Sequence, residues 1–181
     1  MSDTPEMAGP SEQERALLRR RASILARPLV DRALGQEGEL LVARLGAARY
    51  AVRLRELAAV TRLRRISRIP QAPNWVAGLA HEHGDVLTVV DLGALTGEKA
   101  SGPLRFGLLV EVGGEPFALG VPELEGMERD WSGGLDSLPS GVPEKARHFI
   151  ETISPTGTCR LNLSRLLVEL ARITTSPGST P

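Results

Sequence analysis

The chain has 181 residues, enough for one domain of ordinary size or for two small ones that share a core. Hydrophobic residues make up 41% of it and aromatic residues 3%, so the core is expected to be aliphatic. The 22 basic and 22 acidic residues cancel, which argues against recruitment to nucleic acid by net charge. A single cysteine, Cys159, excludes an internal disulfide and a cysteine-rich zinc site, and its apolar neighbours indicate a small buried side chain.

The N-terminal extension is expected to span residues 1–37. Residues 1–10 are polar and lack a signal pattern, and the sequence Ser11-Glu12-Gln13-Glu14 is typical of a capping box that opens a helix. The spacing of apolar residues predicts a helix over about 11–27, which Pro28 ends. No apolar run reaches the roughly 18 residues of a membrane helix. We therefore expect a cytoplasmic protein without membrane insertion.

A repeat organises the next part of the chain. Residues 45–57 align without a gap on residues 112–124. Each segment holds an apolar strand, a turn opened by glycine, and then strict alternation, with Tyr50 matching Phe117. Alternation after a glycine turn predicts a β-hairpin with one buried face.

The repeat resumes towards the end of each half. Trp75-Val76 parallels Phe149-Ile150, and Asp91-Leu92 parallels Asn162-Leu163. Asp and Asn are strong N-caps, so each half is expected to end in a short helix. The resulting prediction is a mainly β domain over 38–173, built from two small barrels at roughly 38–100 and 101–173, with a disordered tail at 174–181.

The cluster His81-Glu82-His83 has the strongest resemblance to a catalytic or metal site. Histidines two residues apart on a strand could share a metal, with His148 or Asp85 as a third ligand. An exposed polar hairpin explains the same residues and is the preferred interpretation. The chain also lacks a Gly-x-Ser-x-Gly elbow and a phosphate-binding loop. We therefore expect no active site, no cofactor and no metal.

Charged residues are unevenly distributed. The stretch Arg53–Arg68 is rich in arginine, whereas residues 111–151 are rich in acids. Two faces of opposite sign would suit contacts with partners or with other copies, although ordinary solvated surface is the simpler interpretation. The arginine stretch also permits an alternative function, in which a small barrel binds nucleic acid. Only Tyr50 and Trp75 lie near it as stacking platforms, and both are expected in the core, so nucleic acid is not the favoured partner.

The stretch Ile69-Pro70-Gln71-Ala72-Pro73-Asn74-Trp75-Val76-Ala77-Gly78-Leu79, followed by residues 84–92, resembles the signature of CheW-like chemotaxis coupling proteins. The resemblance covers about residues 38–170. It implies two SH3-like five-stranded β-barrel subdomains with short helices. It also implies a non-enzymatic adaptor in a bacterial chemosensory system, clustered with its partners in cytoplasmic arrays. The implied partners are the CheW-like domain of a CheA-type histidine kinase and a methyl-accepting chemoreceptor.

In this family, receptor helices lie in a groove between the barrels. The resemblance places the receptor and kinase groove, with its rim, at Leu57, Ala59, Val60, His83, Asp85 and Val86. Two departures stand out: Ala59 replaces a glutamate common in the family, and His81-Glu82-His83-Gly84 replaces Asn-Leu-Arg-Gly. A glutamate–arginine pair is thereby absent at Ala59 and His83. Two alternatives follow: a coupling protein that binds both partners, or an accessory member that binds only one.

Overall fold

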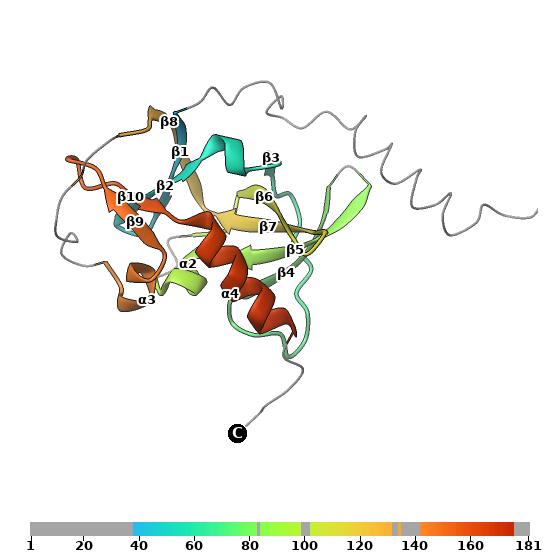
Figure 1. The fold of residues 1–181 in the computed structure, drawn as a ribbon. Helices are drawn as coiled ribbons and strands as arrows, with labels where there is room; N and C mark the ends of the chain where they lie inside the picture. The colour runs from blue at the N-terminus through green and yellow to red at the C-terminus, as the bar shows by residue number, and fades with distance from the viewer. Residues whose placement is uncertain (1–37, 83, 99–101, 132–133, 135–141, 176–181) are drawn as a thin grey trace, which may run out of the picture.

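The computed structural model describes residues 38–82, 84–98, 102–131, 134 and 142–175, which are arranged as two five-stranded sheets with short helices. The predicted mainly β class is confirmed over these residues. The expected helix at 11–27 lies outside them. In Figure 1 the two sheets lie side by side, and the C-terminal helix runs across their junction.

Sheet A has the strand order β8-β1-β2-β10-β9. Its strands are β1 (Glu39–Leu45), β2 (Ala48–Arg53), β8 (Glu123–Arg129), β9 (Ile150–Ile153) and β10 (Cys159–Leu161). Sheet B has the order β3-β6-β7-β5-β4. Its strands are β3 (Ala59–Arg62), β4 (Val76–Glu82), β5 (Asp85–Asp91), β6 (Phe106–Val112) and β7 (Glu115–Val121). The two orders are equivalent, strand for strand, which confirms the duplication inferred from the sequence.

The helices follow the strands closely. They are the 3-10 turn η1 (Leu54–Glu56), α2 (Leu92–Thr96), α3 (Glu144–Arg147) and α4 (Leu163–Thr175). Both predicted caps are present: Asp91 Oδ1 accepts from the Ala94 amide at 3.1 Å, and Asn162 Oδ1 accepts from the Arg165 amide at 3.0 Å. The helix α4 extends to Thr175, so the chain is still helical where the sequence predicted a tail from residue 174.

The sheets do not follow the two halves of the sequence. Sheet A joins the hairpin β1–β2 to the last three strands of the second half, and sheet B joins β6–β7 to the last three strands of the first. The prediction that residues 38–100 and 101–173 each form a barrel is therefore wrong. After β2, η1 turns the chain, and the amide of Ala58 donates to the Leu109 carbonyl of β6 at 2.8 Å. This bond marks the point at which the strands of the first half leave sheet A and join sheet B, which is here called the strand exchange.

The registers of the paired strands show how closely the two halves of the sequence correspond. Tyr50 of β2 pairs in parallel with Cys159 of β10, and the matching Phe117 of β7 pairs in parallel with Thr88 of β5. Thr88 and Cys159 each stand three residues before the cap of the following helix. The predicted equivalences of Tyr50 with Phe117 and of Asp91 with Asn162 are therefore confirmed by strand pairing.

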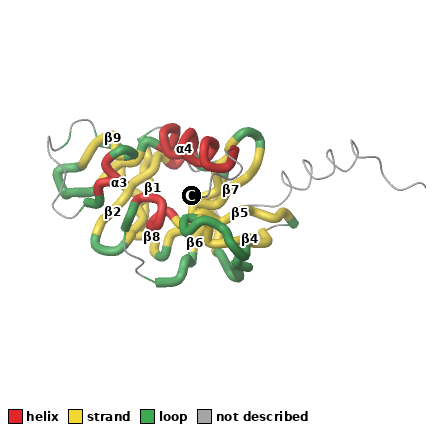
Figure 2. The backbone as a smooth tube through the Cα atoms, turned by 90° about the horizontal axis from the view of Figure 1, so that it is seen from below, coloured by secondary structure: helices red, strands yellow, loops and turns green. Residues whose placement is uncertain are grey.

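Three apolar clusters fill the described part of the chain. The largest lies between the sheets and includes Leu163, Leu166 and Leu170 of α4, the helix at the top of Figure 2. A second cluster fills sheet B, with Leu63, Ala80, Leu87, Val89 and Ala118. The cluster inside sheet A is smaller, with Leu40, Val42 and Ala51 packed against Trp131. Sheet A therefore has fewer apolar side chains available to fill its interior.

Sheet B closes through the segment that follows β3. Ser67 and Leu79 of β4 exchange two backbone hydrogen bonds of 2.8 Å, and the Thr61 hydroxyl donates to Glu82 at 3.0 Å. Gly78 is required at this seam, because its φ is +142° and a Cβ atom would lie 2.2 Å from the Ser67 carbonyl oxygen. The contact joins the two edges of sheet B, as expected for a small barrel.

Candidate partner-binding surface

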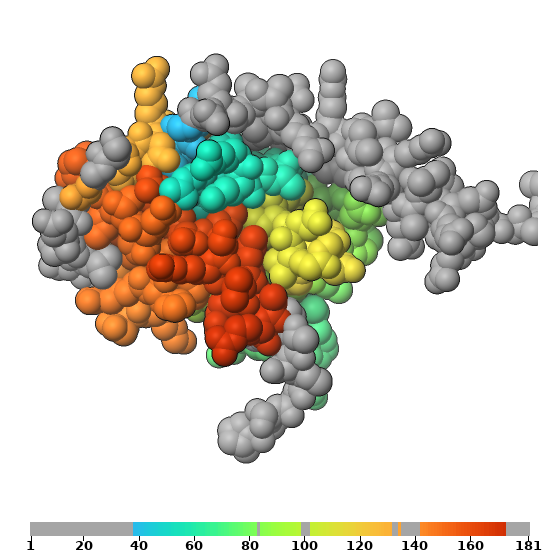
Figure 3. Space-filling view, in the orientation of Figure 1, coloured from blue at the N-terminus to red at the C-terminus, as the bar shows by residue number. Residues whose placement is uncertain are grey.

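The strand β3 carries three of the residues implicated by the sequence. Leu57 precedes it and packs against the central cluster, and Ala59 is half-buried. Val60 is only 6% exposed and faces that cluster, so it supports β3 from within and offers no side-chain surface to a partner. In Figure 3 the segment of η1 and β3, drawn in blue-green, forms part of the surface above α4.

The hairpin β4–β5 carries the other predicted residues, and it presents two different faces. His81 pairs with Val86, and Glu82 pairs with Asp85. Because residues opposite each other in an antiparallel pair share a face, Asp85 lies on the side of Glu82 and Val86 on the side of His81. Glu82 accepts from Thr61 of β3, whereas Val86 is 52% exposed. The structure thus turns Asp85 towards β3 and Val86 away from it.

The hydrogen bond between Thr61 and Glu82 ties β3 to the tip of the β4–β5 hairpin. Ala59 shares a strand face with Thr61, since side chains alternate along a strand. The structure therefore brings Ala59 and Asp85 to the same side of this junction, whereas Val86 is exposed on the opposite face of the hairpin. His83 lies outside the described residues.

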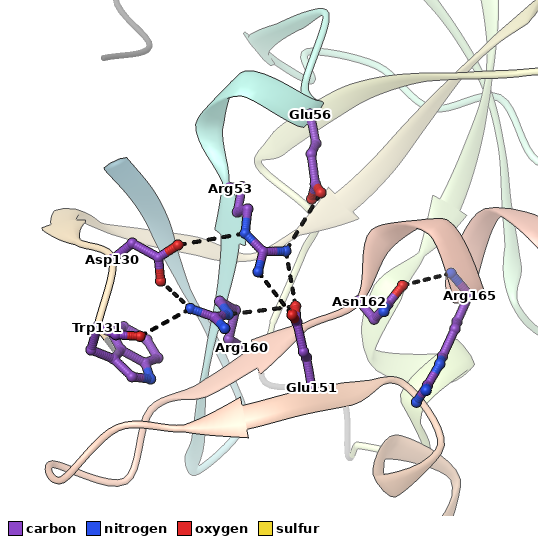
Figure 4. Close-up of polar contacts among 8 residues, drawn as sticks. All are labelled: Arg53, Glu56, Asp130, Trp131, Glu151, Arg160, Asn162 and Arg165. Carbon is purple, nitrogen blue, oxygen red and sulfur yellow. Dashed lines mark hydrogen bonds and ion pairs between the residues drawn. The ribbon is translucent and has the colours of Figure 1, made fainter. Parts of the chain in front are cut away.

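An ionic network that the sequence did not predict lies within sheet A (Figure 4). Arg160 of β10 is 9% exposed; it pairs with Asp130, donates to the Trp131 carbonyl at 3.2 Å and lies 3.5 Å from Glu151. Arg53 of β2 contacts both oxygens of Glu151 at 2.9 Å. Two-point contacts of this kind are the strong form of an arginine–carboxylate pair.

Pseudo-symmetry explains why this network occupies sheet A. The position of Arg160 in β10 corresponds to that of Val89 in β5, which is fully buried in the apolar cluster of sheet B. Likewise, Arg53 corresponds to Gly120 in the aligned hairpins. Thus arginine side chains occupy positions in sheet A whose counterparts in sheet B belong to an apolar interior. An arginine between Cys159 and Leu161 was the available sequence signal.

The same kind of pairing involves part of the acidic stretch at residues 111–151. Arg49 donates to Glu125 at 2.6 Å and to Glu128 at 2.7 Å, and Arg53 pairs with Glu151. A hydrogen bond from Arg53 holds the pKa of the Glu151 carboxyl below its usual value, and a hydrogen bond from Arg49 does the same for Glu125. Part of the acidic stretch therefore neutralises arginines of the same chain.

Groups with possible chemistry are few in the described part of the chain. Cys159 is 1% exposed, and burial raises the pKa of its thiol to about 11, so little thiolate is present at neutral pH. Three or more potential metal ligands do not come together among these residues, where His81 is exposed on the hairpin. Nor does any described helix have the length and apolar character to span a membrane.

The nucleic-acid alternative gains no support from the structure. Tyr50 is 1% exposed, and Trp75 packs against the central cluster, so neither offers an open ring to a base. Arg53, the first arginine of the basic stretch, is engaged in the network of sheet A.

Comparison with known proteins gives two findings. The model of the CheW-like domain matches residues 39–170. A solved structure similar to this chain is the scaffolding protein TtCheW from Thermoanaerobacter tengcongensis, with a TM-score of 0.56 and 21% sequence identity, covering 70% of this chain and 88% of that one. Likeness at this level of identity concerns the fold. A search of curated protein sequences gave no match.

Proposed function

Because the chain belongs to the CheW-like domain family over residues 39–170, we propose that it is a non-enzymatic adaptor in a bacterial chemosensory system. It links or modulates chemoreceptors and a CheA-type histidine kinase through protein contacts, in cytoplasmic arrays. The observation that carries the proposal is the family match, which spans strands of both sheets.

The kinase's own CheW-like domain is the first proposed partner. Two related folds would meet over about 800 Å² per partner, the usual size of a specific interface. We assign the tip of the β4–β5 hairpin, with Asp85 and Val86 on its two faces, and the neighbouring Ala59 to this contact. Val86 is the apolar anchor, because it exposes 52% of its surface on the outer face of the hairpin. Asp85 adds a charge at the rim, which favours orientation over affinity.

The chemoreceptor is the second proposed partner. An apolar groove accepts an amphipathic helix through side chains at helical spacing. The family's glutamate–arginine pair is absent at Ala59 and His83, so receptor binding is expected to be weaker than kinase binding. Restoring the pair with Ala59→Glu and His83→Arg should strengthen receptor binding and leave the melting temperature almost unchanged, because an exposed pair contributes about 0–1 kcal/mol.

A matched pair of substitutions tests the kinase contact. Val86→Asp places a charge on the proposed interface, and Val168→Asp places the same charge on a comparably exposed valine of α4, which is 61% exposed. Isothermal titration against the kinase's CheW-like domain should give a micromolar or tighter Kd for the unmodified chain. Val86→Asp should weaken binding at least tenfold, and Val168→Asp should not change it. Equal effects of the two substitutions would contradict this placement of the interface, and the absence of binding by the unmodified chain would contradict the function.

A further inference from the structure

The segment that begins at the last residue of β3 has an unusual distribution of side chains. Residues 62–68, here called the basic strap, read Arg-Leu-Arg-Arg-Ile-Ser-Arg. Leu63 is 8% exposed and Ile66 is half-buried, and both pack in the apolar cluster of sheet B. The remaining positions, Arg62, Arg64, Arg65, Ser67 and Arg68, are exposed. Two apolar anchors thus hold a short segment whose outer surface is almost entirely arginine.

The strap is fixed at both ends. The amide of Leu63 donates to the Arg105 carbonyl at 2.9 Å, and Ser67 exchanges two backbone hydrogen bonds with Leu79. The Arg62 guanidinium lies over the Phe106 ring, 5.6 Å from its centre. In Figure 1 the strap runs from β3 towards β4, along one side of sheet B. Because the backbone is already ordered, a ligand would meet the arginines without ordering the chain first.

The arginines of the strap lack an acidic partner among the described residues. No ion pair within that part of the chain involves Arg62, Arg64, Arg65, Arg68 or the adjacent exposed Arg105. By contrast, arginines of sheet A engage the acids clustered there, which are Glu125, Glu128, Asp130 and Glu151. Among the described residues, positive charge is therefore uncompensated at the strap and neutralised at sheet A.

We propose that the basic strap binds an acidic segment of a partner protein. Arginine forms two-point hydrogen bonds with carboxylates, and a rigid row of guanidinium groups matches a row of Glu or Asp side chains. A single strand of nucleic acid would also require open aromatic rings, whereas Phe106, the ring beside the strap, already lies beneath Arg62. A second copy of the chain is a poorer match, because the clustered acids of its sheet A, such as Glu125 and Glu151, are already paired with arginines of the same chain.

This proposal goes beyond the receptor and kinase contacts, since it concerns a different set of side chains and a defined partner chemistry. The probe is a fluorescein-labelled peptide of about 16 residues whose glutamates line one helical face, with an otherwise identical glutamine peptide as control. Fluorescence anisotropy with the full chain should show binding of the glutamate peptide alone, weakening as salt rises from about 50 to 300 mM.

Two triple variants localise the binding. Arg64→Gln, Arg65→Gln and Arg68→Gln together remove the outer charges of the strap, and should weaken binding about tenfold or more. Arg129→Gln, Arg147→Gln and Arg165→Gln change the net charge equally at exposed positions elsewhere, and should weaken it less than about twofold. Changing the same three arginines to lysine keeps the charge but removes the two-point contacts. The affinity for the glutamate peptide should then lie between those of the unmodified chain and of the strap glutamine variant. Circular dichroism melts should show that all three variants stay folded.

Three outcomes would overturn the proposal. The glutamate peptide does not bind the unmodified chain, or both glutamine variants lose the same affinity, which would reduce the effect to net charge. In the third, a single-stranded oligonucleotide binds more tightly than the peptide with the same dependence on the strap, which would assign the surface to nucleic acid. None of these results alters the titration of Val86→Asp against the kinase domain.

Discussion

Replacing Arg160 with methionine tests whether ionic pairing stabilises sheet A. Methionine keeps much of the length of the side chain and removes its charge. The variant loses the pairs with Asp130 and Glu151 and the bond to the Trp131 carbonyl. Breaking a buried pair costs about 3–5 kcal/mol. The Asp130 and Glu151 side chains are 24% and 33% exposed, so water can partly solvate them. We therefore expect the free energy of unfolding to fall by about 3 kcal/mol, the lower end of that range.

Urea unfolding followed by circular dichroism measures this cost, and the melting temperature should fall by about 6–12 °C for a chain of this size. Arg172→Met is the control, because its side chain is 77% exposed, and it should cost less than about 0.5 kcal/mol. Adding Asp130→Asn to Arg160→Met should recover part of this cost, since without Arg160 the Asp130 carboxylate keeps only its 3.5 Å contact with Arg53. An Arg160→Met variant within about 0.5 kcal/mol of the unmodified chain would refute the reasoning.

Three further changes follow from the geometry. Gly78→Ala should cost about 3 kcal/mol in urea unfolding, because it combines a positive φ with a clash against Ser67; an unchanged midpoint would show that the seam is not closed. Tyr50→Ala should cost roughly 3–5 kcal/mol, since the ring is 1% exposed, and a smaller loss would mean that the ring is not in the core. The pKa of Glu151 is lowered, so its stabilisation is present above the ordinary value of 4.5 and is lost as pH falls through the lowered value. The melting temperature should therefore fall more steeply with decreasing pH in the unmodified chain than in Glu151→Gln. Parallel curves of melting temperature against pH would contradict this prediction.

Local sequence signals predicted the elements of the fold well. Glycine turns with alternating apolar residues predicted both hairpins, and the caps at Asp91 and Asn162 predicted where α2 and α4 begin. The starts of β4 and β9 also match, at Val76 and Ile150. These features depend on residues within one or two turns of each other, so a single sequence contains the information.

Long-range pairing could not be predicted in the same way. A repeat shows that two hairpins are equivalent, and for that reason it cannot show which of the two a later strand will join. The exchange is decided by η1 and by contacts such as that of Ala58 with Leu109. Similarly, a count of charges cannot show that Arg53 meets Glu151 across 98 residues. The burial of Val60, assigned to the groove from the resemblance, depends on the central cluster that the exchange creates.

The central claim is that this chain acts by binding other proteins of a chemosensory system. The most direct measurement is recovery of its partners from the native cell, with a tagged chain cross-linked in place and its partners identified by mass spectrometry. We expect a CheA-type kinase, a chemoreceptor or both to be enriched with the unmodified chain, and Val86→Asp to reduce recovery of the kinase. Enrichment of neither protein, in cells that contain both, would contradict the claim.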